Sequence, residues 1–406
     1  MRRILLLLFL AFPLAADTTV TLFHFSDYHS HAANLPRAIG FLRAEKRKGA
    51  IVLNGGDTMN KGAPAWSDKY QCAEWPWWNG LLDAMAFGNH DADYGAAAFE
   101  RCRDSVTYPI LSANTTGFRR YDVLTRGKVR IGVFAVAGPD FTSLVQGTGL
   151  TFGDPIAAAH DVVRDLREKE RVDAVVMIGH QHTEEDYELA QAVPGINVIF
   201  GSHSHLARGL TQIKGTNTIF ISPGQYLENI SRIDLTIADG RVKSVSGGLI
   251  PVDERMPAHR ATARRVANMQ RELERDPQYA SLFEPLGQLA APLSVEALAA
   301  RTLEVMRDVT KASGAISTTS SFRRPLPAGT LTLELLRDSM PYDNAIVVCA
   351  VNAAQWERLK AESYVVGTPG ERVATTDYLA GREKLQCEAT GLRVREELRK
   401  SPLAAQ

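Results

Sequence analysis

Short apolar runs that alternate with helix-like stretches constrain the fold of this chain most strongly. Helical patterns occupy residues 36–47, 96–103 and 155–169. Runs rich in β-branched and aromatic residues lie around them and predict strands. Alternation of this kind is typical of a layered α/β domain. The predicted strands are residues 18–25, 50–53, 129–136, 173–178, 196–200 and 218–222.

With 406 residues, the chain is long enough for two or three domains. A polar stretch at 251–257 leads into a charged helical pattern at 260–275, and we place a boundary there. Beyond it, a helix at 293–313 and a strand at 345–351 indicate a smaller α/β domain. The sequence predicts a first domain over 17–252, a helical linker over 253–290 and a C-terminal domain over 291–406.

The N-terminus has the composition of a secretory signal peptide over residues 1–16. Basic Arg2 and Arg3 are followed by an apolar stretch over 4–14 and by small residues up to Ala16. This stretch is shorter than the roughly 20 residues that span a bilayer. A buried N-terminal strand is the alternative. We expect cleavage near Ala16, a periplasmic or secreted protein and no stable membrane anchor.

The chain has four cysteines, two in each half. An exported protein meets an oxidising compartment, where an even number of cysteines is typical of disulfides. The simplest pairing joins Cys72 to Cys102 and Cys349 to Cys387, and four buried thiols are the alternative.

The charge balance argues against one class of partner. Lys and Arg number 46, Asp and Glu also 46, and no basic block stands out. Proteins that bind nucleic acids or anionic membranes carry a basic patch. We therefore expect neither as the main partner.

Five polar clusters follow directly on apolar, strand-like segments. In layered α/β folds, loops at the carboxyl ends of strands converge, so these clusters can meet in one place. Seven of the ten histidines lie in or beside them. The clusters are Ser26-Asp27-Tyr28-His29, Gly55-Gly56-Asp57, Gly88-Asn89-His90-Asp91, Gly179-His180-Gln181-His182 and Gly201-Ser202-His203-Ser204-His205.

The chemistry of the clusters favours a metal centre. Imidazoles and carboxylates bind borderline divalent ions such as zinc, manganese or iron(II). The potential ligands exceed what one tetrahedral site would use. A carboxylate can bridge two ions about 3.5–4 Å apart, the spacing of two-metal hydrolysis.

Some residues near the clusters have an ordinary structural interpretation. His31 and His182 can be ligands or polar surface residues, and the sequence leaves both open. His24 lies inside a predicted strand, and we interpret it as packing. Four of the five tryptophans lie between residues 66 and 78. They can line the site, but we favour packing under a long loop.

In this order, the clusters resemble the motifs of the calcineurin-like metallophosphoesterases. Ser112-Ala113-Asn114 and Glu184-Glu185-Asp186 are similar, more specifically, to the secreted 5'-nucleotidase family, which includes UDP-sugar hydrolases and cyclic phosphodiesterases. The resemblance spans residues 20–230. It implies an α/β fold, a layered β-sandwich flanked by helices, followed by a smaller α/β C-terminal domain.

The C-terminal part resembles the substrate domain of that family in altered and shortened form. Pro341-Tyr342-Asp343-Asn344 matches its pattern. The chain has residues 318–322 where the family has an Asn-Gly-Gly run, and Gly381-Arg382-Glu383 where it has Gly-Gly-Asp-Gly-Tyr. The loops that hold a nucleoside in relatives are therefore changed, and the leaving group stays open.

The resemblance implies two divalent metal ions, Mn, Zn or Fe. They lower the pKa of a bound water, and the metal-bound hydroxide attacks the phosphate ester. By position, one ion is held by Asp27, His29, Asp57 and His205, and the second by Asp57, Asn89, His180 and His203, so that Asp57 bridges them.

Three more roles follow from the resemblance. His90 stabilises the transition state and protonates the leaving group. Asp93 fixes its tautomer, the alternative being a cap for a helix that starts near Gly95. Arg323 binds the substrate phosphate, with Arg324 or a solvated pair as alternatives.

The sequence therefore predicts an exported two-metal phosphohydrolase, a metal-dependent phosphoric ester hydrolase acting on nucleotides or related phosphomonoesters in nucleotide catabolism. One alternative is a hydrolase of another ester, such as the thiosulfate-ester hydrolases that resemble the same branch. A second is a non-catalytic exported binding protein. The intact His90, Asp93 and seven predicted ligands argue against the second alternative.

Overall fold

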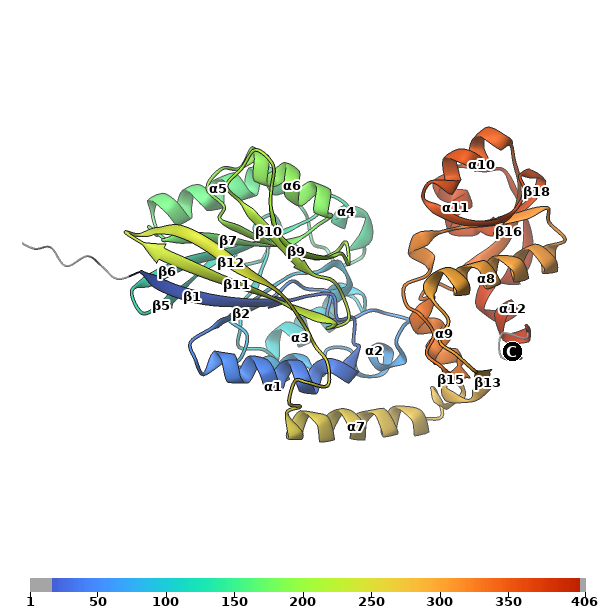
Figure 1. The fold of residues 1–406 in the computed structure, drawn as a ribbon, viewed down its shortest axis with the longest axis horizontal. Coiled ribbons are helices and arrows are strands. Elements are labelled where there is room, and N and C mark those ends of the chain that lie inside the picture. Colours follow the sequence, from blue (N-terminus) through green and yellow to red (C-terminus); the bar gives the residue numbers. More distant parts are fainter. Residues whose placement is uncertain (1–16, 402–406) are drawn as a thin grey trace, which may run out of the picture. The chain divides into compact units, whose positions relative to one another are not determined.

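The computed structural model describes residues 17–401, and the predicted signal peptide lies outside them. These residues form two compact units (Figure 1). The first comprises residues up to 60 and 71–266, the second 61–70 and 267 onward. The division falls inside α7 (Arg260–Arg275), within the predicted linker. The predicted domain limits at 252 and 290 stay a prediction.

The first unit contains two six-stranded sheets, of which one has the order β12-β11-β1-β2-β3-β4. Strands β1 to β4 run parallel, whereas β11 and β12 form an antiparallel hairpin beside β1. The strands are β1 (Thr18–Phe25), β2 (Ile51–Asn54), β3 (Ala84–Ala86), β4 (Ile110–Leu111), β11 (Asn229–Ala238) and β12 (Arg241–Pro251).

The second sheet of this unit has the order β5-β6-β7-β8-β10-β9. Its four central strands run parallel, and antiparallel strands close both edges. The strands are β5 (Tyr121–Arg126), β6 (Val129–Ala137), β7 (Ala174–His180), β8 (Val198–Phe200), β9 (Ala207–Gln212) and β10 (Ile219–Pro223).

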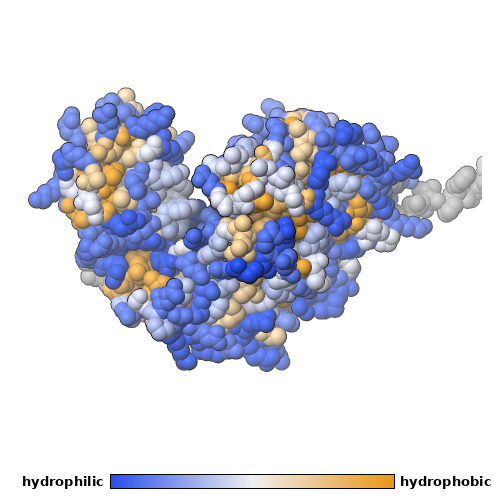
Figure 2. Space-filling model, turned by 180° about the vertical axis from the view of Figure 1, so that it is seen from behind, coloured by the Kyte–Doolittle hydropathy of each residue, from blue (hydrophilic) through white to orange (hydrophobic). Residues whose placement is uncertain are grey.

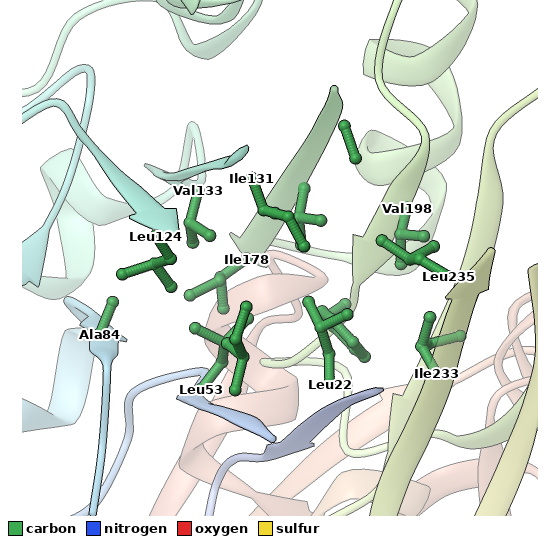
Figure 3. Packing of buried hydrophobic residues seen from close by; sticks show 14 of the residues in the cluster. Leu22, Leu53, Ala84, Leu124, Ile131, Val133, Ile178, Val198, Ile233 and Leu235 are labelled. Atoms are coloured by element: carbon green, nitrogen blue, oxygen red, sulfur yellow. The ribbon is translucent and has the colours of Figure 1, made fainter. Parts of the chain in front are cut away.

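An apolar layer between the two sheets forms the main core of the first unit (Figure 3). Leu22 and Leu53 come from one sheet, Ile131 and Ile178 from the other, and all four are fully buried. Burial of each such side chain contributes about 1.5–3 kcal/mol. The alternation of inward-facing residues along β1 and β6 therefore holds the two layers together.

Helices cover the outer faces of the sheets. Leu166 and Leu189 belong to a second apolar cluster, which joins α5 and α6 to the outer face of the second sheet. In the first sheet, the ring of Phe23 in β1 packs against the ring of Phe41 in α1, with 5.3 Å between the ring centroids. These layers confirm the predicted fold class. The helices of the unit are η1 (Ala32–Asn34), α1 (Leu35–Lys46), η2 (Trp75–Trp78), η3 (Asn89–Ala92), α3 (Ala96–Asp104), α4 (Phe141–Leu144), α5 (Pro155–Glu168) and α6 (Thr183–Ala192).

The second unit is a smaller α/β body with a five-stranded sheet, β17-β14-β18-β16-β19, and a two-stranded sheet, β13-β15. Its strands are β13 (Pro285–Leu289), β14 (Gly314–Thr318), β15 (Gly329–Thr332), β16 (Ala345–Val351), β17 (Ser363–Gly367), β18 (Gly370–Thr376) and β19 (Cys387–Arg393). Its helices are α2 (Ala65–Tyr70), η4 (Ala280–Phe283), α8 (Val295–Thr310), η5 (Thr319–Ser321), α9 (Leu333–Ser339), α10 (Ala353–Lys360), α11 (Asp377–Arg382) and α12 (Val394–Lys400).

Helix α2 belongs to the second unit although its sequence lies far from the rest of that unit. The Ala65 amide donates to Glu334 Oε1 at 2.6 Å, and Arg337 lies 3.3 Å from the Asp68 carboxylate. Both partners come from α9. Residues 61–70, which follow the Asp57 loop along the chain, are therefore part of the C-terminal unit.

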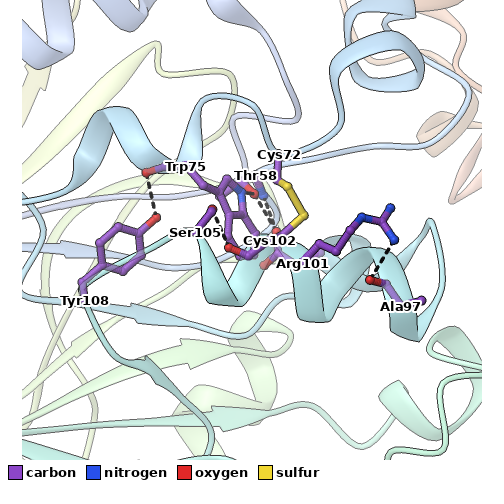
Figure 4. The surroundings of a disulfide bond; sticks show 9 residues. Thr58, Cys72, Trp75, Ala97, Arg101, Cys102, Ser105 and Tyr108 are labelled. Atoms are coloured by element: carbon purple, nitrogen blue, oxygen red, sulfur yellow. Dashed lines mark hydrogen bonds between the residues drawn. A yellow bond between two sulfur atoms is a disulfide. The ribbon is translucent and has the colours of Figure 1, made fainter.

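Two disulfides join Cys72 to Cys102 and Cys349 to Cys387, which confirms the simplest predicted pairing. The first lies next to Trp75 and Thr58 in the first unit (Figure 4). The second links the neighbouring strands β16 and β19 of the other unit. Each unit thus carries one covalent crosslink.

On the face shown in Figure 2, hydrophilic residues dominate the surface and apolar residues form separate patches. Scattered apolar residues are normal on folded proteins. Among the described residues, no helix combines the length and the apolar character needed to cross a membrane.

Candidate metal centre

The five predicted clusters all lie at the carboxyl ends of strands in the first unit. Parallel pairing places the ends of β1, β2 and β3 at one edge of their sheet, and those of β7 and β8 at one edge of the other. The residues that follow or end these strands are Asp27 after β1, Asp57 after β2, Asn89 after β3, His180 at the end of β7, and His203 and His205 after β8.

Two groups of potential ligands form at these strand ends. In each group, one ligand atom per residue lies within 4.8 Å of the others. Within them, the Nε2 atoms of His29 and His205 are 2.9 Å apart, and His180 Nε2 lies 3.3 Å from Asp57 Oδ2. The groups are Asp27, His29 and His205, and Asp57, His180 and His203.

Backbone carbonyls set the tautomers of two of these imidazoles. His29 Nδ1 donates to the Met59 carbonyl at 3.0 Å, and His180 Nδ1 donates to the Gly55 carbonyl at 2.5 Å. A carbonyl oxygen can only accept, so Nδ1 carries the proton in both rings. In the neutral ring Nε2 then carries the lone pair, so Nε2 is the atom that can bind a metal ion.

The burial of unpaired ligand atoms shows that the residues fit metal ions. Asn89 Oδ1 and His180 Nε2 are buried and make no hydrogen bond with the described residues. An unsatisfied buried polar atom costs about 1–3 kcal/mol. Coordination would satisfy both atoms, and nitrogen and oxygen donors suit borderline divalent ions.

Five of the predicted ligands have a left-handed backbone. The residues are Asp27 (φ 50°), His29 (φ 46°), Asp57 (φ 50°), His203 (φ 60°) and His205 (φ 56°). Non-glycine residues rarely adopt this region, and each instance costs about 1–3 kcal/mol. Strain concentrated on these residues is typical of a functional site, where the surrounding fold enforces the conformation.

Gly88 makes room for the loop of Asp57. A Cβ atom on Gly88 would lie 2.2 Å from the Asp57 backbone nitrogen and 2.3 Å from its Oδ1. No side chain fits at such distances, so glycine at 88 allows the β2 and β3 loops to approach each other.

Electrostatics in this region favour positive charge beside Asp57. Burial alone would raise the pKa of the Asp57 carboxyl, but the charges of His180 and His90 outweigh it and hold that pKa well below its usual range. Burial alone would lower the pKa of His180, whereas the charge of Asp57 raises it to about 10. The carboxylate is thus ionised and ready to accept a cation.

Asp91 organises the site although it was given no role in the sequence analysis. Its Oδ2 accepts hydrogen bonds from the amides of Asp57 (3.1 Å) and Gly88 (2.9 Å). Its Oδ1 accepts from the Thr58 amide and hydroxyl, and Trp75 Nε1 donates to that hydroxyl at 2.6 Å. Burial and the charge of Asp57 raise the pKa of Asp91 to about 6. Asp91 therefore ties the β2 loop to the β3 loop.

His90 and Asp93 form a hydrogen-bonded pair at the same place. His90 Nδ1 donates to Asp93 Oδ2 at 2.7 Å, and the His90 amide donates to Asp57 Oδ1 at 2.8 Å. Helix α3 begins after Gly95 without a side-chain cap. Asp93 therefore contacts His90, and its role in fixing the His90 tautomer stays a prediction.

A third group, which was not predicted from the sequence, lies beside the second ligand group. Asp140 Oδ2 is 3.0 Å from His203 Nε2 and 3.6 Å from His182 Nε2. Burial alone would raise the pKa of Asp140, but its interactions with His182 and His203 outweigh it and lower that pKa. Asp140 follows β6 at its carboxyl end, a position that could have drawn attention to it.

The remaining residues near the clusters have structural surroundings. His24 is fully buried and stacks on Phe200 at 4.8 Å, which agrees with packing. His31 belongs to none of the three ligand groups among the described residues, and its ring lies 3.9 Å from that of Tyr226. Trp66, Trp75 and Trp78 are buried, as expected for packing.

Arg323 lies in the second unit. Its Nη2 donates to Tyr342 Oη at 2.9 Å, and the guanidinium lies over the Tyr342 ring at 5.3 Å. Arg324 forms an ion pair with Asp338 at 2.7 Å. Arg324 is therefore engaged in the fold of its own unit, and the role of Arg323 in phosphate binding stays a prediction.

Comparisons with known proteins show what this chain is similar to. Residues 20–207 match the calcineurin-like phosphoesterase family. The UshA protein of Yersinia enterocolitica is 24% identical over 84% of this chain and 76% of its own length. The 5'-nucleotidase of Vibrio cholerae is 26% identical over 59% of this chain. The chain spans only about half of that relative, 53% of its length.

Two solved structures share the fold over most of both chains. A 5'-nucleotidase precursor from Thermus thermophilus superposes with a TM-score of 0.73 at 19% identity, covering 94% of this chain and 96% of its own. The sulfate thiohydrolase SoxB of Thermus thermophilus gives a TM-score of 0.74 at 16% identity. The superposition covers 94% of this chain and 93% of SoxB. At such identities the likeness establishes the fold alone.

Proposed function

We propose, from the premise that residues 20–207 form a calcineurin-like phosphoesterase domain, that this chain is a two-metal hydrolase of phosphate esters. The observation that carries the proposal is the convergence of two ligand groups, Asp27 with His29 and His205 and Asp57 with His180 and His203, at neighbouring strand ends.

The ligand sets are part of the proposal. Asn89 completes the second set, because its buried Oδ1 lacks a hydrogen-bond partner among the described residues. Asp57 would be shared by the two sets. Divalent ions held there would polarise the phosphate ester and activate a water molecule for attack on phosphorus.

His90 is the proposed general acid. Asp93 accepts the Nδ1 proton of His90 at 2.7 Å, which leaves Nε2 as the atom that can deliver a proton to the leaving oxygen. The bond from the His90 amide to Asp57 Oδ1 holds the residue next to the proposed bridging ligand.

We infer that the substrate is a nucleotide or a related phosphomonoester. The relatives named UshA and 5'-nucleotidase support a small-molecule nucleotide substrate. Arg323 would bind its phosphate, because a guanidinium matches phosphate oxygens in a bidentate geometry. Arg323 is half-buried and donates to the hydroxyl of the exposed Tyr342 in the second unit.

Phosphate release from AMP and from an aryl phosphate, by protein reconstituted with manganese or zinc, tests the proposal. Faster turnover of AMP would support recognition of a nucleoside. Turnover of the aryl ester alone would support the metal centre and redirect the search to other esters, including thiosulfate esters. If neither is hydrolysed while two ions are bound, the proposed function is wrong.

Asp57→Asn provides the matching variant for that assay. It should lower both metal content and turnover, because the neutral amide cannot bridge two cations as a carboxylate does. Asp253→Ala is the control, since Asp253 pairs with Arg255 and belongs to none of the ligand groups. Turnover of Asp57→Asn equal to that of the control would contradict the two-metal assignment.

We also propose that the protein is exported. Residues 1–16 have the composition of a signal peptide, and the two disulfides are typical of an oxidising compartment. The mass of the protein recovered from the periplasm or the medium should match a chain that begins near Asp17. Recovery of the full chain from the cytosol alone would contradict export.

A further inference from the structure

We propose that Asp140 is a positioning residue for the second metal ion: it accepts the Nε2 proton of His203, so that Nδ1 of His203 becomes the metal ligand. The inference rests on the proposed function, because it presupposes that His203 binds an ion. It adds a residue that neither the motifs nor the comparisons single out.

The geometry of the contact defines which nitrogen is available. His203 Nε2 lies 3.0 Å from Asp140 Oδ2, a normal hydrogen-bond distance. A carboxylate can only accept, so the proton resides on Nε2. A protonated ring nitrogen has no lone pair to offer a metal, and Nδ1 is the remaining donor. His203 therefore differs from His29 and His180, whose protons reside on Nδ1.

The hydrogen-bond partner of His203 differs in kind from the partners of His29 and His180. His29 and His180 donate to the backbone carbonyls of Met59 and Gly55. The partner of His203 is a side-chain carboxylate, which makes the ring a stronger ligand through its negative charge. Only this contact of the three can be removed by substituting a side chain.

The surrounding chain holds Asp140 in place. The Gly138 amide donates to the His180 carbonyl at 2.9 Å, which ties the loop after β6 to the end of β7. A Cβ atom on Gly138 would lie 2.8 Å from Asp140 Oδ1, so glycine leaves the space that the carboxylate uses. His182 supports Asp140 from the solvent side: its Nε2 lies 3.6 Å from Oδ2, and its side chain is 52% exposed.

Asp140, His182 and His203 could alternatively hold a third ion, since their ligand atoms also lie within 4.8 Å of one another. The hydrogen bond from His203 argues against this. A ring that donates Nε2–H to Asp140 cannot use that nitrogen for an ion beside Asp140. We therefore infer that Asp140 contacts the ligand His203 and not an ion of its own.

Titration of the metal-free protein with Mn²⁺, followed by calorimetry and by EPR spectroscopy, tests the assignment. The wild type should bind two ions. Asp140→Ala should lower the affinity for one of these ions by about 10–100-fold and leave the affinity for the other unchanged. Asp140→Asn keeps an acceptor oxygen but loses the negative charge. It should therefore lower the affinity for the same ion by a smaller factor.

The control is Asp253→Ala, which removes a carboxylate of similar exposure, 27% against 29% for Asp140, that pairs with Arg255. It should bind both ions as the wild type does. Two ions bound with wild-type affinity by Asp140→Ala would overturn the inference. If that variant fails to fold, wild-type affinity in Asp140→Asn would overturn it instead.

Two further outcomes separate the possible failures. Binding of three ions by the wild type, reduced to two in His182→Ala, would replace the inference with a third metal site. Binding of no ion by the wild type would overturn the inference together with the proposed function. If the wild type binds two ions and the Asp140 substitutions do not change their affinities, the proposed function stands and only the positioning role is rejected.

Discussion

At the scale of residues, the candidate site depends on which nitrogen of each imidazole is fixed by a hydrogen bond within the fold. His29 and His180 present Nε2 because carbonyl groups hold Nδ1. His90 donates its Nδ1 proton to Asp93, so proton transfer to a substrate would use Nε2. Such preorganisation lets a proton or an ion be bound without reorienting the ring. Substitutions of single residues can therefore separate metal binding from proton transfer.

His90→Ala should keep both ions and lower kcat by about 10²–10⁴-fold, because general acid catalysis contributes about that much. Metal content by mass spectrometry and kcat for the best substrate provide the measurement. Asp93→Asn serves as the comparison and should cause a smaller loss, since the imidazole remains. Loss of an ion in His90→Ala would instead identify His90 as a ligand.

His24→Phe should change the pH dependence of stability. Burial lowers the pKa of His24 to about 3, so the native ring is neutral while the unfolded one, with a pKa of about 6.5, binds a proton on acidification. Between these values the unfolded state binds more protons, and stability falls as pH falls. From pH 7 to pH 5 the wild type should lose about 2 kcal/mol through His24.

Urea unfolding of the chelator-treated proteins at pH 7 and pH 5 measures this effect. The loss in His24→Phe should be smaller than in the wild type by that amount, because phenylalanine does not titrate. Equal losses in both proteins would show that His24 is not the titrating group.

At the scale of elements, parallel strand pairing explains how the site forms. Strand β1 agrees with the predicted range, and β2, β6, β7, β8 and β10 lie within two residues of theirs. The hairpin of β11 and β12 was not predicted. Its β12 is half-exposed along much of its length, so its composition lacks the apolar run that marks a buried strand. Close approach of the loops after β2 and β3 then requires glycine.

Gly88→Ala should abolish metal binding or destabilise the first unit, because the new Cβ would lie 2.2 Å from the backbone of Asp57. Clashes with backbone cannot be relieved by a side-chain rotation. Gly209→Ala is the control, since a Cβ there meets no atom within 4 Å. Thermal unfolding and Mn²⁺ titration of both variants measure this effect. A Gly88→Ala protein with the stability and Mn²⁺ affinity of the control would contradict the requirement for glycine at position 88.

At the scale of the whole molecule, each unit has its own sheets, core and disulfide. The Cys72–Cys102 bond closes a loop of 30 residues in the first unit, and Cys349–Cys387 one of 38 in the second. A crosslink stabilises mainly by restricting the unfolded chain. The two bonds should therefore act on different units.

Replacing Cys72 and Cys102 by alanine should lower the unfolding free energy of the first unit by about 3 kcal/mol. Replacing Cys349 and Cys387 should lower that of the second by a similar amount. Hydrogen exchange during urea unfolding assigns each loss to a unit. A loss spread equally over both units by either pair would show that they unfold as one body.

The sequence by itself determined the layered α/β class and the strand ends that carry Asp27, Asp57, Asn89, His180 and His203, because period and composition are local properties. Only the tertiary structure decided the partners of those side chains. Asp140 contacts His203 across 63 residues, and Asp91 reaches the Asp57 amide across 34. Hydrogen bonds of this kind depend on how strands from distant segments pair. No local pattern encodes that pairing, so the contacts that Asp140 and Asp91 make with these residues could not be predicted from the sequence.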